Sequence, residues 1–415
     1  MDGLTIKLTQ KNMMIFGTIM LSCSFYVLSL YSWGSIVVFL IAMALSITSS
    51  YGQGNNRIII SFKLEWIHYF VIAFGLFGIC TSFWAVSPSN AITRGISVLE
   101  LCILLILIIP AYLKVSDAED ILNAIKWSGY AIVIICFIYY GPSAVLASIF
   151  TGRRLDSTFL NTNTIGLITA DAIIIEIYQI IKDHKFYLRG VLLIPCLVML
   201  AASESRKALV TAVVGVLLTL LLLNRGRITG VKLFRFIAIV VAAIVAIYLI
   251  MTLQIFSGVA ERMVNLFAQM RTSGDDWVDH SAWMRNNLVH LGLQLFNSHK
   301  IGGVGLDNTR FYVKQQYNYD YYLHNNYVEV LAGTGIIGFL LYYIPYIIIG
   351  IKLFRLRKTS DTTYAVITTL FLMQLMNDYG MVSYYSKETY LMLALLFVYI
   401  KQAMQTAEMT CEEAS

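Results

Sequence analysis

The segment YNYDYYLHNN at residues 317–326 runs directly into YVEVLAGTGIIGFLLYYIPYIII at residues 327–349. The second segment is long enough to cross the hydrocarbon core of a bilayer, which takes roughly 20 apolar residues in a helix. The first is the end of the only long polar segment in the sequence, from about Gly258 to Asn326. This junction predicts a membrane-spanning helix preceded by a polar, tyrosine-rich loop.

Composition extends this pattern to all 415 residues, of which 58% are hydrophobic and 13% are charged. Soluble domains carry about 25% charged residues, so we expect an all-α, polytopic membrane protein that forms a single integral membrane domain over residues 1–415. About 12 spans are predicted, near residues 13–31, 33–49, 66–86, 96–113, 127–141, 164–181, 190–203, 207–223, 234–256, 327–349, 363–379 and 388–403. Residues 257–326 then form one long external loop between the ninth and tenth spans.

Basic residues predict the orientation of these spans. With the N-terminus in the cytoplasm, the cytoplasmic segments hold 18 of the 30 Lys and Arg residues, and the short outer loops hold 6. Short cytoplasmic loops are enriched in Lys and Arg, whereas long loops cross the membrane largely regardless of charge. We therefore expect both termini in the cytoplasm and the long loop outside. The net charge of +6 follows from this loop bias, so it does not indicate nucleic-acid binding.

The long loop contains a pattern typical of an amphipathic helix. Ser281 is a candidate N-cap for a helix from about Ala282 to Phe296. Its apolar face would carry Met284, Leu288, Leu291 and Leu295, and its polar face Asn286, His290, Gln294 and Asn297. We expect this helix to lie on the membrane surface or to pack on the mouth of the bundle. Arg285, at the edge of the apolar face, is suited to reach a lipid phosphate.

Glycines follow this predicted helix, at Gly302, Gly303 and Gly305. They permit a tight turn whose backbone approaches another segment closely. No strand–helix unit surrounds them, so they do not predict a nucleotide site.

Two further positions carry groups suited to chemistry. His324 titrates near neutral pH and suits a general base for a sugar hydroxyl, although a polar interface residue is the simpler interpretation. Ser203 or Ser205 would cap the next helix and set Arg206 at its outward N-terminus, a natural phosphate site. The alternative is an interfacial arginine, or an ion pair of Arg206 with Glu204.

The stretch before the sixth span adds more candidates. Arg153 and Arg154 run against the orientation bias, which suggests that they bind a pyrophosphate; structural pairing with Asp156 is the alternative. Asn161 and Asn163 either cap the following helix or donate hydrogen bonds to a sugar.

Other polar groups favour structural interpretations. Asp171 and Glu176 lie inside the sixth span, where they form either an ion path or interhelical hydrogen bonds. An acidic cluster at Asp275, Asp276, Asp279 and His280 is expected to be solvated rather than to bind a metal. The loop tyrosines either stack on sugar rings or form an interfacial belt.

Taken in order, four motifs resemble those of the O-antigen ligase/polymerase superfamily of bacterial membrane glycosyltransferases. They are Arg154 with Thr158-Phe159-Leu160-Asn161-Thr162-Asn163, then Ser205-Arg206-Lys207-Ala208, then Gly303-Val304-Gly305-Leu306-Asp307-Asn308, and last His324-Asn325-Asn326-Tyr327-Val328-Glu329-Val330-Leu331 with Gly335-Ile336-Ile337-Gly338. The departures include Thr162 where the family has proline and Lys207 where it has a small residue.

The resemblance implies a GT-C-like helical enzyme in the bacterial cytoplasmic (inner) membrane. Its donor would be a glycan on undecaprenyl diphosphate, and its acceptor a second glycan or lipid A–core. His324 would activate the acceptor hydroxyl and Arg206 would bind the donor pyrophosphate, with Arg285, Arg154 and Arg153 as further cations. Asn161, Asn163 and Asn325 would be substrate-binding residues. Neither a metal ion nor a cofactor is expected.

The resemblance leaves the reaction open between two transfers, which share the donor and the motifs. A polymerase of repeat units for O-antigen or capsular polysaccharide is the first expectation, and an O-antigen ligase is the alternative. A flippase and a chain-length regulator would be its partners in the membrane. From another class, a transporter of lipid-linked sugars would fit Asp171 and Glu176, but it would not need His324.

Overall fold

The computed structural model describes residues 9–28, 34–50, 63–151, 154–224, 280–358 and 361–413, and these ranges are helical with no β-strand. The α-helices are α1 (Gln10–Val27), α2 (Gly34–Ser50), α3 (Trp66–Cys80), α4 (Pro88–Val115), α5 (Ala118–Tyr140), α6 (Pro142–Thr151), α7 (Thr162–Asp183), α8 (Phe186–Ala202), α9 (Arg206–Leu223), α12 (His280–Ser298), α13 (Thr309–Tyr317), α14 (Asn326–Arg355), α15 (Thr363–Asp378) and α16 (Lys387–Glu413). Short 3₁₀ turns follow α3 and α14, at Thr81–Phe83 and Leu356–Lys358.

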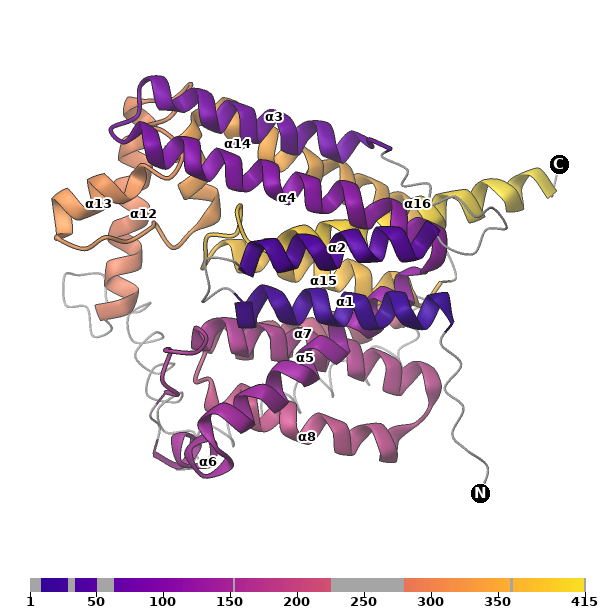
Figure 1. Cartoon of the computed structure of the whole chain (residues 1–415). Coiled ribbons are helices and arrows are strands. Elements are labelled where there is room, and N and C mark those ends of the chain that lie inside the picture. Colours follow the sequence, from indigo (N-terminus) through magenta and orange to yellow (C-terminus); the bar gives the residue numbers. More distant parts are fainter. Residues whose placement is uncertain are drawn as a thin grey trace.

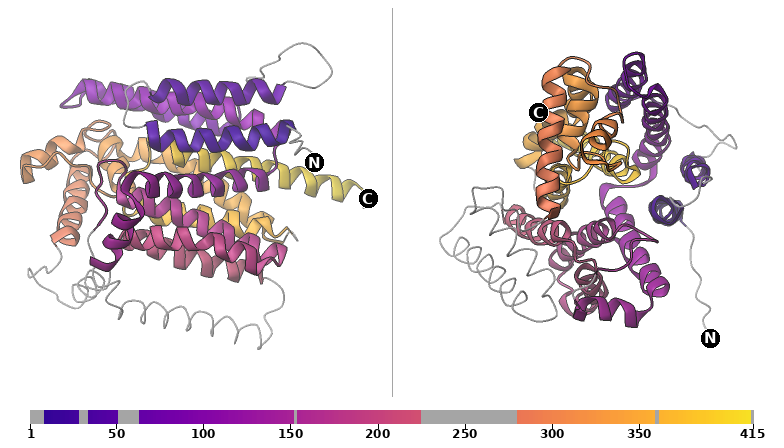
Figure 2. Two further views of the ribbon diagram at one scale, coloured as in Figure 1. Left: turned by 60° about the horizontal axis from the view of Figure 1, so that its bottom comes forward. Right: turned by 90° about the vertical axis from the view of Figure 1, so that its left-hand side faces the viewer.

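The long helices lie side by side and form a bundle, with the start of α1 and the end of α16 at the same end (Figure 1). The helices α12 and α13 lie at the opposite end. The right-hand view of Figure 2 looks along the bundle from that end, where α12 lies across the ends of other helices. One end of the bundle therefore carries the start of α1 and the end of α16, and α12 and α13 lie at the other.

The predicted spans agree with this architecture wherever the structure describes them. Each span outside residues 234–256, which lie beyond the described ranges, falls on a helix. Within the described residues, seven helical segments are long and apolar enough to cross a membrane. Shorter apolar helices lie at Gly34–Ser49, Pro142–Thr151 and Arg189–Ala202. The architecture is that of a polytopic membrane protein, and the count of 12 spans is not confirmed.

Capping side chains mark where several helices begin. Asp117 accepts a hydrogen bond from the backbone N–H of Asp120 at the start of α5. Ser205 does the same for Ala208 at the start of α9. Such caps satisfy backbone donors that have no partner within the helix. At the other end of α5, Gly141 adopts a φ of 81°, and Pro142 begins a new helix there.

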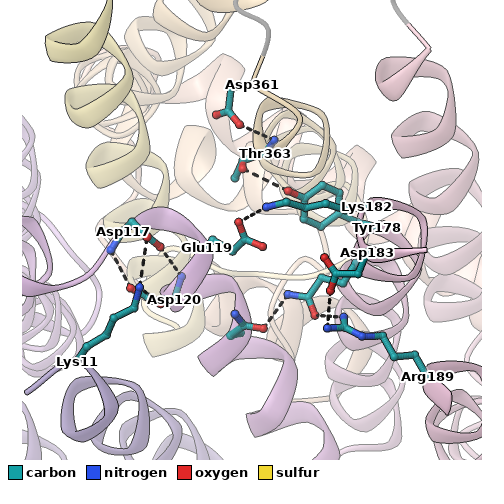
Figure 3. Close-up of polar contacts among 12 residues, drawn as sticks. Lys11, Asp117, Glu119, Asp120, Tyr178, Lys182, Asp183, Arg189, Asp361 and Thr363 are labelled. Atoms are coloured by element: carbon teal, nitrogen blue, oxygen red, sulfur yellow. Dashed lines mark hydrogen bonds and ion pairs between the residues drawn. The ribbon is translucent and has the colours of Figure 1, made fainter. Parts of the chain in front are cut away.

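Ion pairs join the helices at the end away from α12 (Figure 3). Lys11 contacts Asp120 of α5 at 2.9 Å, and Arg189 of α8 contacts Asp183 of α7 at 2.6 Å. Further contacts in the same region join Lys182 to Glu119 and the Tyr178 hydroxyl to Thr363. Residues that the charge bias assigns to the cytoplasmic side thus lie together at one end of the bundle.

One ion pair of this region lies deep between α5 and α7. The Lys126 Nζ is 3.0 Å from the Glu176 carboxylate, and the two side chains are 4% and 0% exposed. Lys126 also donates to the Gln179 Oε1 at 2.6 Å. This contact favours the structural interpretation of Glu176 over an ion path, because Lys126 compensates the charge of the carboxylate within the protein.

Because a buried ion is costly once its partner is removed, typically by about 3–5 kcal/mol, we expect Glu176→Leu to destabilise the protein strongly. The double variant Lys126→Met/Glu176→Leu should recover most of the loss. Thermal unfolding of the purified protein in detergent measures both. Glu119→Gln, which removes the partly exposed partner of Lys182, is the matched control and should cost about 1 kcal/mol or less. A single variant as stable as the control would contradict the assignment.

Candidate functional site

A cavity of about 830 Å³ lies where α12 meets the ends of α7, α9 and α15. Its volume is within the range of small-molecule sites. Its walls also include the segment before α14 and the connection between α15 and α16. Segments more than 200 residues apart in sequence therefore enclose one polar space at the end of the bundle.

Most of the predicted site residues meet in this cavity. Those that line it are Arg154, Asn161, Asn163, Arg285 and His324. Arg206 begins α9 beside the cavity but does not line it, whereas its neighbour Lys207 does. Asn325 is buried outside the lining. Arg153 lies outside the described residues.

His324 faces the cavity from a left-handed backbone conformation with a φ of 55°. Its ring lies 4.4 Å from that of Tyr322, centroid to centroid. Burial, followed by the positive charges of Arg285 and Lys207, lowers the pKa of His324 to about 4. The imidazole is therefore neutral at physiological pH, with a ring nitrogen able to accept a proton.

The residues around His324 hold the backbone that carries it. Asn325 caps α14 by accepting from the Val328 N–H at 3.1 Å. The buried carboxylate of Glu329 accepts from the Leu323 N–H at 2.8 Å and from the Thr309 hydroxyl. Asn325 and Glu329 thus position the histidine from both sides, and Asn325 has the structural role of an N-cap.

Asn326 connects the same motif to the far side of the cavity. Its side-chain Oδ1 accepts from the backbone N–H groups of Ser383 and Tyr384, at 2.9 and 3.0 Å. Its Nδ2 donates to the Tyr343 hydroxyl at 2.9 Å. The segment between α15 and α16, which supplies cavity residues, is therefore fixed relative to His324.

A break in α14 lies nine residues further on, at Gly335. Gly335 has φ 62° and ψ −165°, a conformation that side chains other than hydrogen rarely adopt. The glycine-rich segment pairs with the break: the Val304 N–H donates to the Ala332 carbonyl at 2.9 Å and the Gly305 N–H to that of Gly333 at 2.8 Å. A Cβ on Gly303 would lie 2.4 Å from the Gly333 backbone. These glycines therefore serve close backbone approach, as predicted.

Asn308 ends the same segment and anchors it to α4. Its Oδ1 accepts from the Ser87 N–H at 2.7 Å, and its Nδ2 donates to the Leu306 carbonyl. Asp307 accepts from Arg94 at 2.9 Å. The Gly-x-Gly-x-x-Asn motif is thus a structural clamp between α4 and α14.

The helix α12 confirms the amphipathic pattern predicted for residues 282–296. Leu288, Leu291 and Leu295 are buried, and they pack with Val304, Val313, Leu323, Val328 and Ala332. Asn286, His290, Gln294 and Asn297 are exposed. Packing on α14 in this way turns Arg285 toward the cavity.

Arg154 and the start of α7 form another wall. The Arg154 guanidinium donates to the Asn163 Oδ1 at 2.8 Å, and the Ser205 hydroxyl donates to the same oxygen at 2.9 Å. Asn161 caps α7 by accepting from the Asn163 N–H at 2.9 Å. Asn163 thus joins the first two predicted motifs, and Asn161 is an N-cap that also lines the cavity.

The remaining candidates divide between cavity and scaffold. Tyr319, Tyr321 and Tyr322 line the cavity, as do Asp171 and Glu388 from α7 and α16. Tyr327 instead donates to the Leu375 carbonyl at 2.8 Å. Asp275, Asp276 and Asp279 lie outside the described residues. In the part of the chain that the structure describes, no group of three or more His, Cys, Asp or Glu side chains is arranged to hold a metal ion.

Sequence reasoning missed Lys207 as a cavity residue. The signal was present in its motif, where Lys207 follows Arg206 and replaces a small residue. Neighbouring residues of a helix point about 100° apart, and here the side chain of Lys207 lines the cavity whereas that of Arg206 does not.

Comparison with known families supports the assignment that the motifs predicted. The family model described as O-antigen ligase matches residues 191–343, from α8 into α14. Among curated proteins none matches the chain. Three of the four motifs fall within the matched residues, and the one at residues 154–163 precedes them.

The fold is that of a polytopic membrane protein, and over residues 191–343 the chain is similar to the O-antigen ligase family. The match supports an assignment to the O-antigen ligase/polymerase superfamily, so the predicted resemblance is confirmed over these residues.

Replacement of Gly335 by alanine should destabilise the region that carries His324. The new Cβ would lie 2.2 Å from the Ile301 carbonyl oxygen, and the backbone conformation alone costs roughly 1–3 kcal/mol for residues other than glycine. We expect a lower unfolding temperature in detergent. Gly190→Ala is the matched control, because nothing lies within 4 Å of a Cβ there. Equal unfolding temperatures for the two variants would argue against the clamp.

Proposed function

We propose that the protein is a polymerase of lipid-linked oligosaccharide repeat units for a surface polysaccharide. One observation carries the proposal: His324, whose pKa is lowered to about 4, shares a cavity with arginines that come from distant segments, Arg154 before α7 and Arg285 on α12. A base for an acceptor hydroxyl and cations for a leaving diphosphate are the two requirements of such a transfer.

In the proposed reaction, a ring nitrogen of His324 accepts the proton of an acceptor sugar hydroxyl. The hydroxyl oxygen bonds to the anomeric carbon of the donor glycan, and the bond from that carbon to the diphosphate oxygen breaks. The products are the extended glycan, the lipid diphosphate and one proton, which leaves from His324. Direct attack inverts the anomeric configuration, so retention in the product would contradict this scheme.

Arginines suit the leaving group because a guanidinium binds phosphate oxygens with two parallel hydrogen bonds. Arg285 is exposed at the cavity, and Arg154 is held by Asn163 at 2.8 Å. We assign both to the donor diphosphate, whose lipid would be undecaprenyl. Arg206 stays a candidate for the same task, since it begins α9 next to a cavity residue.

The second candidate is an O-antigen ligase, which transfers the finished polymer to lipid A–core. The description of the matching family model favours it. The two reactions share the base and the donor and differ in the acceptor. In either case the proposal sets the cavity on the outer face of the cytoplasmic membrane, with both termini in the cytoplasm.

The first test is the surface-polysaccharide profile, on gels, of a deletion strain of the host bacterium complemented with variants. His324→Ala should leave single repeat units, because the acceptor hydroxyl loses its base. Arg285→Ala and Arg206→Ala should shorten or abolish the ladder. His290→Ala is the matched control, since His290 is exposed on the far face of α12, and it should restore the wild-type ladder.

Other profiles lead to different conclusions. Long polymer that is no longer attached to lipid A–core in the deletion strain identifies the ligase. A full ladder from His324→Ala, with the protein present in the membrane, rules out the base assignment.

The pH dependence of the purified enzyme tests the same histidine. Activity requires neutral His324, so it should fall as pH drops through the pKa. For kcat/KM, which reports the free enzyme, the acid limb should lie near pH 4 rather than near the ordinary value of about 6.5. A bound diphosphate offsets the nearby cations, so the acid limb of kcat should lie at higher pH. An acid limb of kcat/KM near 6.5 would contradict the cationic surroundings.

A further inference from the structure

Lys207 lines the cavity as the second residue of α9, and its position is electrostatically costly. It adjoins Arg206, and both it and Arg285 act on His324 as neighbouring positive charges. It also lies in the first turn of a helix, where the helix dipole disfavours a cation. Lys207 and Arg285 thus converge in the cavity at the N-terminus of α9, with Arg206 beside them.

The protein offers Lys207 little compensation for this cost. Its Nζ donates to the Gly380 carbonyl at 3.5 Å, the long limit of a hydrogen bond. Within the described residues no carboxylate lies within 4.0 Å of it. The negative charge of Asp378 attracts Lys207 only from longer range. The Asp378 oxygens accept hydrogen bonds from Ser383 at 2.6 Å and from Asn326 at 3.3 Å instead.

We propose that Lys207 binds the diphosphate of the lipid-linked donor, together with Arg285. This inference rests on the proposed function and adds a residue that replaces a small side chain in the Ser-Arg-Lys-Ala motif. An ammonium group carries three donors and no acceptor, and the long contact to Gly380 uses one of them. A diphosphate would fill the remaining donors and would turn the repulsion between Lys207 and Arg285 into shared attraction.

A purely structural Lys207 makes a different prediction. A lysine that only filled space against Gly380, whose Cβ position lies 3.2 Å from the Lys207 Cδ, could be replaced by methionine without loss of ligand affinity. Such a variant would keep the apolar stem and would remove a partly buried charge, so it should fold.

The test measures binding of a short isoprenyl diphosphate, and of the corresponding isoprenyl alcohol, to the purified full-length protein in nanodiscs. Lys207→Met should weaken diphosphate binding by roughly 10- to 100-fold, the effect of one hydrogen bond to a charged group, and leave alcohol binding unchanged. Lys207→Arg should retain most of the affinity. Lys314→Met, which removes an exposed lysine of α13 outside the cavity lining, should bind like the wild type.

A second measurement does not depend on ligand. The titration of His324, followed by NMR of the histidine rings and assigned with His324→Gln, should shift upward in Lys207→Met because one of the two nearby cations is gone. Arg285, Tyr321 and Tyr322 are the other titratable groups that face His324, and they are unchanged in this variant. Lys207→Gln serves the same comparison if the methionine variant does not fold.

The outcomes separate the inference from the proposed function. Wild-type diphosphate affinity in Lys207→Met overturns the assignment of Lys207 and leaves the donor proposal standing. Equal loss for the diphosphate and the alcohol also overturns it, because the effect then acts through cavity shape. A wild-type protein that does not bind the diphosphate overturns both. An unshifted His324 titration rules out the proximity on which the inference depends.

Discussion

The backbone pairing at the break in α14 is the interaction on which the candidate site depends. A helix interrupted at Gly335 leaves carbonyl and N–H groups without helical partners, and such groups are costly where water is excluded. The segment before α13 supplies those partners: Val304 and Gly305 donate to the helix, and the Ile336 N–H donates to the Lys300 carbonyl. Because α12 leads into this segment and His324 follows α13, the pairing sets the position of both walls of the cavity.

Electrostatics gives the site its second property. The basic residues of the cavity come from three separate segments, so no local sequence rule brings them together. The same packing partly buries the His324 ring beside them, which lowers the pKa of the imidazole. Cations that attract a diphosphate and a base that stays unprotonated are therefore consequences of one arrangement, and binding of an anion would then raise the basicity of the histidine when the reaction needs it.

The fold was largely predictable from the sequence because apolar length and helical periodicity act locally. The runs at residues 66–86 and 164–181 fell on α3 and α7, and the pattern at residues 282–296 fell on α12. Helix caps were equally local, as Ser205 illustrates. The predicted span at residues 234–256 lies outside the described residues, so this agreement does not extend to it.

The site was predictable only in part, since a motif names residues but not the direction in which each points. Arg206 and Lys207 are adjacent, yet only Lys207 lines the cavity. Asn325 is adjacent to His324, yet its side chain turns back to cap α14. In both pairs, neighbouring side chains point in different directions from the backbone. Which of the two side chains faces the cavity depends on how α9 and α14 pack in three dimensions.

The His-Asn-Asn-Tyr-x-Glu motif therefore consists mainly of scaffold. Of its polar side chains, His324 lines the cavity, whereas Asn326 and Glu329 are buried and bind backbone groups of other segments. A buried carboxylate that holds two donors, as Glu329 does, tolerates little displacement, because each lost hydrogen bond to a charged group costs about 1.5–3 kcal/mol. The motif thus serves mainly to position the His324 imidazole at the end of the helix bundle, and the cations around this ring come from other segments of the chain.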